Sequence, residues 1–200
     1  MPSFELLPEE QQFLDRILRQ AAGSRSFGAK DEWLFDEVLD GVPQRSEDDS
    51  AQSGWLNACR TIALTAVSER CLAPRAADRA LSRAWSLDNS PEAAIGTDDW
   101  VAAFRVVGFT CDPDEPFEQP TSPTQVWRGA PTERARGLAW TTDIHVAADF
   151  AGATAGASRG GVWTTVVPPQ LVLARYNTRA EDEWVIDARE LQLELYTPSI

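Results

Sequence analysis

The segment VWTTVVPPQLVLARY, residues 162–176, decides the fold class of this chain. Its two apolar runs, 162–167 and 171–176, have the length and the β-branched composition of strands. Two more strand-like runs follow at 183–186 and 191–196. In the last of these, leucines at every second position alternate with polar residues, which is the period of a half-buried strand. The C-terminal part of the chain therefore predicts a small β-sheet.

Upstream of this segment, the β pattern extends back to residue 126. Val126-Trp127-Arg128 and Leu138–Thr142 predict two further strands. Asp143 is a favourable helix N-cap, because its carboxylate can accept hydrogen bonds from the first free N–H groups of a helix. The alanine-rich run that follows it predicts a helix through Ala151.

The first hundred residues have the period of helices. Apolar residues recur at three- and four-residue spacing, and Pro, Asp and Gly mark the starts and ends. This pattern predicts helices over residues 8–23, 31–41, 55–67 and 74–85, and one or two more, opened by Pro91 and by Thr97, that extend through Phe104.

Between these halves, Cys111–Pro123 contains four prolines and four acidic residues, so it predicts a connector with no helix or strand of its own. Helices followed by strands, without alternation, indicate an α+β fold with a small mixed sheet. We expect a helical region at residues 1–111, the connector at 112–124 and the β core at 125–200, packed as one compact unit.

Composition excludes several classes of protein. The chain has 200 residues, of which 43% are hydrophobic and 24% charged. These values are ordinary for a globular domain and argue against a disordered chain, a collagen or a coiled coil. No apolar run has the roughly 18 residues of a membrane span. The N-terminus shows no secretory signal, so we expect a cytoplasmic protein with no membrane partner.

Cysteine and histidine are too scarce for most metal and nucleophilic chemistry. Cys59, Cys71 and Cys111 are far apart and form no C-x-x-C pair, so we expect reduced thiols and no metal site. The only histidine, His145, removes most Ser-His and Cys-His mechanisms. Its position after Asp143 favours a solvent-facing or capping role.

The net charge of −13 is unevenly distributed. Residues 1–124 carry 11 basic and 22 acidic side chains, whereas residues 125–200 carry 7 arginines and 9 carboxylates. An acidic chain repels nucleic acid at long range, so a nucleic-acid partner is not expected. The nearly neutral C-terminal part is the better place for an anionic ligand.

Three short features in that part have chemical potential. Arg128 ends an apolar strand and precedes Gly129, so it can clamp a phosphate while the glycine lets a ligand approach. Trp140-Thr141-Thr142 places hydroxyls beside an aromatic ring. If residues 181–183 are extended, Glu181 and Glu183 project from one face, one pleat apart. Carboxylates so placed can divide electrostatic and proton-accepting roles.

In this order, the three features resemble the arginine, Ser-Thr-Ser and Glu-x-Glu elements of mono-ADP-ribosyltransferases. The matching residues are Arg128-Gly129, Ala139-Trp140-Thr141 and Glu181-Asp182-Glu183. The resemblance covers roughly residues 125–196, including the helix from Asp143 to Phe150. It implies an ADP-ribosyltransferase-like sheet core and NAD as the substrate.

The resemblance also implies a role for each residue. Glu183 would stabilise the positive charge on the ribose, Thr141 would orient Glu183, and Glu181 would orient or deprotonate the acceptor. The remaining residues would contact NAD: Arg128 a phosphate or ribose, Gly129 the nicotinamide amide, Trp140 or Phe150 a stacked ring, and Thr142 a neighbouring polar group. In the family, the Glu-x-Glu form accompanies arginine acceptors on proteins.

Three alternatives remain open. Water in place of the acceptor would make the protein an NAD glycohydrolase. Ala139, which lacks the hydroxyl of the first Ser-Thr-Ser position, favours a catalytically silent module of the same fold that binds a nucleotide or a protein. The acidic first half also suggests a nucleic-acid mimic, although acidic helix surfaces explain the same charges.

Overall fold

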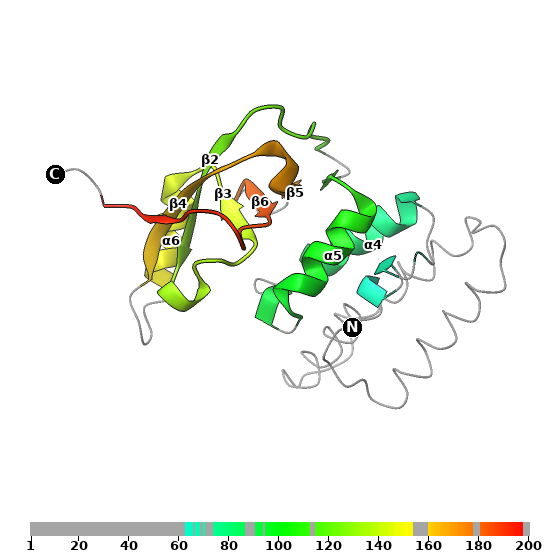
Figure 1. Cartoon of the computed structure of the whole chain (residues 1–200), viewed down its shortest axis with the longest axis horizontal. Coiled ribbons are helices and arrows are strands. Elements are labelled where there is room, and N and C mark those ends of the chain that lie inside the picture. The colour runs from blue at the N-terminus through cyan, green and yellow to red at the C-terminus, as the bar shows by residue number, and fades with distance from the viewer. Residues whose placement is uncertain are drawn as a thin grey trace. The chain divides into compact units, whose positions relative to one another are not determined.

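The computed structural model describes the chain from residue 63 onward, with gaps. The described residues are 63–65, 67, 68, 70, 74–86, 91–93, 95–112, 115–153, 160–177 and 181–197. The predicted helices at 8–23 and 31–41, and most of that at 55–67, lie outside them. The chain divides into two compact units, Met1–Gly108 and Phe109–Ile200. Figure 1 colours the described residues by residue number. Among the described residues, no helix has the length and apolarity to cross a bilayer.

The first unit contains the helices predicted from residues 74 and 91. They are α4 (Pro74–Ser86), a 3-10 turn η1 (Pro91–Ala93) and α5 (Thr97–Val107). Acidic residues in the first turn of α5 favour its N-terminus electrostatically. The helix ends at Gly108, whose φ of 95° is a left-handed value that suits glycine. The Gly108 N–H donates to the Phe104 carbonyl at 2.8 Å.

Aromatic rings form the core between α4 and α5. Trp85 meets Trp100 edge to face, with ring centroids 5.0 Å apart, and Phe104 at 5.6 Å. All three side chains are buried. The Trp100 indole N–H donates to the Pro91 carbonyl at 3.1 Å, so its polar atom is satisfied inside the core.

The second unit is a seven-stranded mixed sheet with one helix on it. In chain order its elements are β1 (Thr110–Cys111), β2 (Thr124–Ala130), η2 (Thr132–Arg134), β3 (Ala139–Thr141), α6 (Ile144–Ala153), β4 (Gly161–Val167), η3 (Pro169–Leu171), β5 (Val172–Tyr176), β6 (Glu183–Ile186) and β7 (Glu194–Leu195). The spatial order is β1-β5-β6-β3-β2-β4-β7. Only β1 and β5 are parallel, and all other neighbours are antiparallel.

This arrangement confirms most of the expected strands. Each predicted strand before residue 187 is present within a few residues of its expected ends, and α6 occupies the predicted helix. The sheet begins earlier than expected, because Thr110 and Cys111 pair with β5. The helical part therefore ends at Gly108 rather than at residue 111.

The last predicted strand, 191–196, is largely wrong. Only Glu194–Leu195 pairs with β4. Leu191 and Leu193 pack against the sheet core, but Leu195 is 54% exposed. β7 is the outer strand of the sheet, so a neighbouring strand lies on one side of it only. The alternating leucines do not extend its pairing with β4 beyond two residues.

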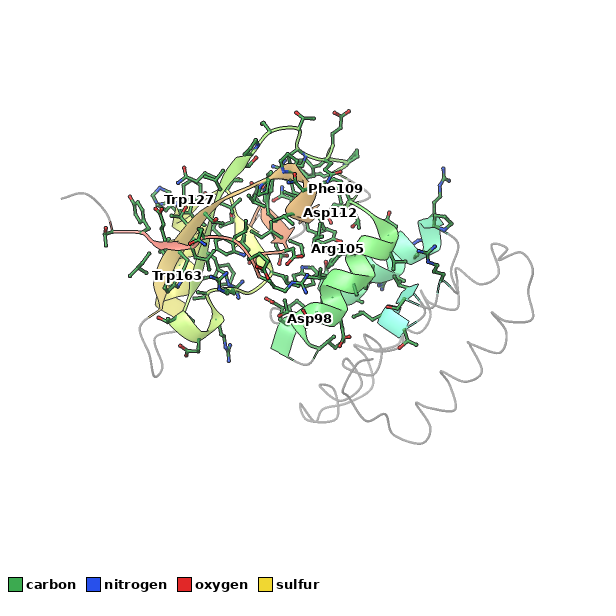
Figure 2. All side chains as sticks on the ribbon, in the orientation of Figure 1. Asp98, Arg105, Phe109, Asp112, Trp127 and Trp163 are labelled. Atoms are coloured by element: carbon green, nitrogen blue, oxygen red, sulfur yellow. The ribbon has the colours of Figure 1, made fainter. Side chains whose placement is uncertain are left out.

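The two sheet faces are covered differently. One carries the main hydrophobic core, made of Val126, Trp140, Val167, Val172, Trp184, Ile186 and Ala188. The other is covered over β2 by α6, which also contacts β3 and β4 (Figure 1). Trp127 and Trp163 come from the paired strands β2 and β4 and are labelled in Figure 2.

A single arginine side chain holds the backbone of the segment that follows β6 through hydrogen bonds to its carbonyl groups. The Arg136 Nη1 donates to the carbonyls of Ala188 (3.0 Å), Arg189 (3.0 Å) and Leu191 (2.9 Å). Arg136 precedes β3, so these bonds join two loops that are distant in the sequence.

We expect Arg136→Gln to lower the free energy of unfolding by about 1.5–3 kcal/mol, the usual value of hydrogen bonds to a charged group. Urea denaturation measures the change. Arg134→Gln is the matched control, because Arg134 is likewise exposed and on the same loop, whereas the three carbonyl contacts belong to Arg136; it should change stability by less than about 0.5 kcal/mol. Equal effects from the two substitutions would contradict the role of Arg136.

Candidate functional site

The three predicted motifs lie on three neighbouring strands. Glu183 is on β6, Thr141 on β3 and Arg128 on β2, and the sheet order places β6, β3 and β2 side by side. Thr141 is paired with Glu183 on one side and with Trp127 on the other. Residues directly opposite each other in antiparallel strands share a face. Glu183, Thr141 and Trp127 therefore form a row across one face of the sheet.

The link between the two glutamates is not extended, which corrects the prediction. Asp182 has a φ of 43°, in the left-handed region, and β6 begins only at Glu183. Glu181 and Glu183 are thus not successive same-face residues of a strand. Both side chains are partly buried. The Asp182 N–H donates to the Asn177 Oδ1 at 3.3 Å, which helps to hold this turn.

Thr141 holds the main chain of the motif. Its hydroxyl donates to the Glu181 carbonyl at 2.8 Å and accepts the Asp143 N–H at 3.1 Å. A hydroxyl has one proton to donate, and here that proton is directed at a carbonyl. Thr141 therefore positions the glutamates through the Glu181 backbone, whereas a direct bond to the Glu183 carboxylate was the expected arrangement.

The N-cap predicted at Asp143 is present. Its Oδ1 accepts the His145 N–H at 2.8 Å, and the His145 side chain is exposed. The cap residue lies two residues after Thr141 and directly before α6, so the hydroxyl that contacts the glutamate turn also contacts the helix start.

Asp182 is a functional candidate that the sequence reasoning missed. Its Oδ1 accepts from the Arg175 Nε at 2.7 Å and from the Trp184 Nε1 at 3.2 Å. Its Oδ2 accepts a short hydrogen bond from the Thr142 hydroxyl. Thr142, predicted to contact NAD, is therefore bound to Asp182. The sequence did contain a signal for this turn. Asp182 directly precedes a predicted strand, and Asp tolerates left-handed backbone better than most residues.

Arg128 belongs to the opposite face of the sheet. Since Trp127 shares a face with Thr141, strand alternation places Arg128 on the other side. Its Nε donates to the Arg134 carbonyl at 3.1 Å and its Nη1 to the Ala139 carbonyl. The register thus separates Arg128 from the Thr141–Glu183 row, and its predicted phosphate role stays a prediction.

Gly129 has a structural reason to be glycine. A Cβ at this position would lie 1.9 Å from the Ala147 carbonyl oxygen and 2.4 Å from the Ala151 nitrogen. Both atoms belong to the backbone of α6. The glycine therefore permits close packing of the helix on β2, whatever contact its own backbone makes with a ligand.

The two aromatic candidates differ in access. Trp140 is 2% exposed and donates its indole N–H to the Gly137 carbonyl at 2.7 Å. This burial corrects the prediction of a stacking surface at Trp140, because the ring is part of the core. Phe150 on α6 is 43% exposed and remains able to stack. Trp127 has a buried indole N–H with no hydrogen-bond partner among the described residues.

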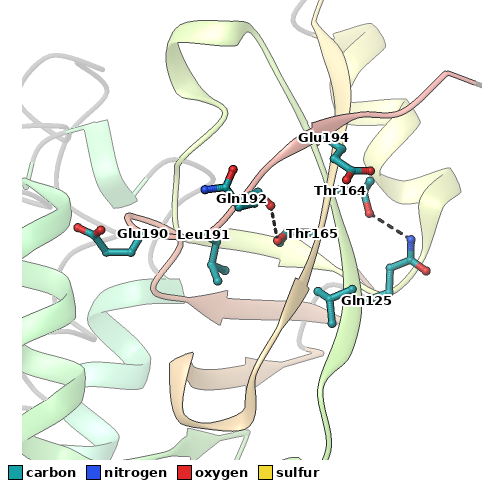
Figure 3. A pocket seen from close by; sticks show the side chains of 8 residues that line it. Gln125, Thr164, Thr165, Glu190, Leu191, Gln192 and Glu194 are labelled. Carbon is teal, nitrogen blue, oxygen red and sulfur yellow. Dashed lines mark hydrogen bonds between the residues drawn. The ribbon is translucent and has the colours of Figure 1, made fainter.

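The sheet unit also has a pocket of about 460 Å³ away from these residues. It is lined by Gln125, Thr164, Thr165, Val166, Glu190, Leu191, Gln192 and Glu194. Figure 3 shows two of its hydrogen bonds, from Gln125 to Thr164 and from Thr165 to the Gln192 carbonyl. It shares no residue with the predicted site. The cavity and the predicted motif thus occupy different parts of the unit, although the cavity lining also contains a threonine paired with a glutamate, Thr164 with Glu194.

Comparisons of the chain with protein-family models, with curated proteins and with solved structures found no match. Function must therefore be argued from the residues themselves.

Proposed function

We propose that this protein is an NAD-dependent mono-ADP-ribosyltransferase that transfers ADP-ribose to a protein side chain, with arginine as the acceptor. The observation that carries the proposal is the pairing of Thr141 with Glu183 on adjacent strands. A hydroxyl strand beside the strand that begins at the second glutamate of a Glu-x-Glu motif is what the resemblance to this family leads one to expect. The order β6-β3-β2 adds the arginine strand as the next neighbour.

The chemistry asked of Glu183 is electrostatic. Cleavage of the nicotinamide–ribose bond sends the bonding electron pair to nicotinamide and leaves positive charge on the ribose, as in glycoside hydrolysis. A fixed carboxylate beside that charge lowers the barrier, because it is oriented before the reaction begins. Strand pairing with Thr141 and Tyr176 holds the Glu183 main chain on both sides and so fixes the point at which its side chain leaves the sheet.

Trp127 offers a donor on the same face. It lies two strands from Glu183, about 10 Å at the usual strand spacing. Its indole N–H has no partner among the described residues but is buried, so it could donate to the nicotinamide carboxamide only if the ring became exposed when NAD binds. This would supply the polar contact that the sequence had assigned to Gly129, while Phe150 keeps the stacking role assigned to it.

Glu181 is proposed as the base for the acceptor. An arginine nitrogen attacks the ribose carbon, and the proton that it loses passes to Glu181. Glu181→Gln should therefore leave NAD hydrolysis within about threefold and reduce transfer by about 10²-fold or more, the usual scale of general base catalysis. Nicotinamide release and labelling of a small guanidine acceptor measure the two rates.

Glu194→Gln is the matched control for Glu181→Gln, because it removes an exposed carboxylate from β7, away from the motif strands. It should leave both rates unchanged. Equal loss of hydrolysis and transfer in Glu181→Gln would contradict the division of roles between the two glutamates.

Two observations favour the silent module as the second candidate. Ala139 has no hydroxyl to offer, and the Thr141 proton is directed at a carbonyl. Calorimetry with NAD distinguishes the candidates when it is combined with nicotinamide release by the same protein. Binding without release, in the presence of cell lysate as a source of acceptors, would favour the silent module. Release without transfer would favour the NAD glycohydrolase.

A further inference from the structure

We propose that Asp182, the middle residue of the Glu-Asp-Glu motif, is the positioning residue of the site. Its carboxylate fixes the turn that presents Glu181 and Glu183. The reaction that the glutamates perform rests on the proposed function, whereas the anchoring itself rests only on the contacts of Asp182.

The Asp182 carboxylate collects donors from three different places in the sheet. Arg175 is on β5, Trp184 on β6 and Thr142 directly after β3. Both carboxylate oxygens are used, so the side chain is held in one orientation. Because β5, β6 and β3 are neighbours, the carboxylate connects the ends of three adjacent strands at the point where the motif begins.

The arginine that contacts Asp182 is itself held in place. The Arg175 guanidinium carbon lies 3.8 Å from the centroid of the Phe117 ring and 5.2 Å from that of the Trp184 ring. Such cation–π contacts restrict the guanidinium to the region between the rings. The ion pair is also shielded, with only 29% of the Arg175 side chain and 25% of the Asp182 side chain exposed. A partner so restricted gives Asp182 a rigid anchor.

The backbone of Asp182 needs this anchor. A φ of 43° is unfavourable for a residue with a Cβ, and such strain persists only where surrounding contacts enforce it. The left-handed residue turns the chain between the glutamates. Glu181 can then present its carbonyl to the Thr141 hydroxyl while Glu183 starts the strand opposite Thr141. Thr141 thus contacts the chain on both sides of Asp182, by a hydrogen bond to Glu181 and by strand pairing with Glu183.

Three substitutions separate the backbone from the carboxylate. Asp182→Gly keeps the left-handed conformation without strain but removes the carboxylate. Asp182→Asn tolerates the same backbone and retains one oxygen acceptor. Asp182→Ala loses both. If the carboxylate is the anchor, kcat for nicotinamide release falls by about 10²-fold in Asp182→Gly and Asp182→Ala, because a small displacement of the reacting groups has that effect. Asp182→Asn should recover part of the loss.

The KM for NAD distinguishes positioning from binding. Asp182 is occupied by protein donors, so KM should stay within about threefold in all variants, since uniform binding of substrate is not affected. Asp187→Asn is the matched control, because Asp187 has its own 2.7 Å ion pair with Arg189 just beyond the other end of β6. It should lower stability without the loss of kcat. A rise in KM with unchanged kcat, or equal kcat losses in Asp187→Asn and Asp182→Gly, would overturn the proposal.

Hydrogen exchange gives a readout that does not depend on activity. In Asp182→Gly, the amides of residues 181–184 should exchange at least about tenfold faster, while those of β4 keep their rates. The indole N–H resonance of Trp184 should also shift, because it loses its acceptor. If the wild-type protein releases no nicotinamide, these changes would uphold the anchor and reject only the enzyme. Unchanged exchange and an unchanged Trp184 resonance would overturn the anchor in either case.

Discussion

Glu183→Gln is expected to lower nicotinamide release from NAD by about 10²–10³-fold, the usual cost of removing one preorganised electrostatic group from a transition state. The substitution preserves the size of the side chain and its place opposite Thr141, and it removes only the charge. The KM for NAD should change little, because the charge matters most when the ribose becomes positive.

Chromatography of nicotinamide, with the variant and the wild-type protein side by side, measures this effect. Glu194→Gln again serves as the control for an unspecific loss of negative charge. Circular dichroism and a melting curve show whether the variant keeps the fold. A folded Glu183→Gln protein with wild-type release would exclude Glu183 from catalysis and remove the main support for the proposed transferase.

Apolar runs were sufficient to locate most of the sheet. Runs such as 162–167 and 183–186 have the composition that strands require, and both become strands with nearly the predicted ends. The pairing of these strands is a different matter. Some neighbours are consecutive, such as β2 with β3 and β5 with β6, but β3 also pairs with β6 and β2 with β4 across longer stretches of chain. The periodicity of a segment does not indicate which distant segment it will pair with.

The sequence predicted which residues lie on neighbouring strands, but it did not predict the face of the sheet on which each side chain lies. Arg128, Thr141 and Glu183 lie on neighbouring strands as the motif order suggested. However, side chains alternate along a strand, so a register shift of one residue moves a side chain to the other face. The observed pairing of Trp127 with Thr141 places Arg128 on the other face of the sheet from Thr141 and Glu183. Nothing in the sequence of either strand specifies that register.

The missed role of Asp182 has a similar cause. Between two glutamates, an aspartate has the pattern of a charged run, and in an extended run its side chain would lie on the face opposite to theirs. Its importance depends on Arg175, Trp184 and Thr142, which the fold brings together from separate strands. A conformation set by tertiary contacts is not visible in local sequence.

Gly129→Ala is the substitution expected to damage the fold most. The added Cβ would overlap the Ala147 carbonyl oxygen at 1.9 Å and the Ala151 nitrogen at 2.4 Å, whereas real Cβ contacts are essentially never closer than 3.0 Å. Backbone atoms of a helix cannot rotate away as a side chain does, so α6 must shift as a body. Overpacking usually costs about 1–3 kcal/mol and occasionally more. Since the whole helix has to move, we expect about 3 kcal/mol or more.

A matched control for Gly129→Ala lies on α6 itself. A Cβ at Gly152 would have no heavy atom within 4 Å, and this glycine is helical and exposed. Gly152→Ala should therefore be neutral or stabilise the helix by up to about 1 kcal/mol. Both variants add one methyl group, and only the one at Gly129 meets the backbone of α6, so a loss of stability in urea that is confined to Gly129→Ala reports the helix–strand contact. For a unit of this size, 3 kcal/mol corresponds to a fall in Tm of more than about 10 °C. Similar melting temperatures for the two variants would show that α6 does not pack on β2 through Gly129.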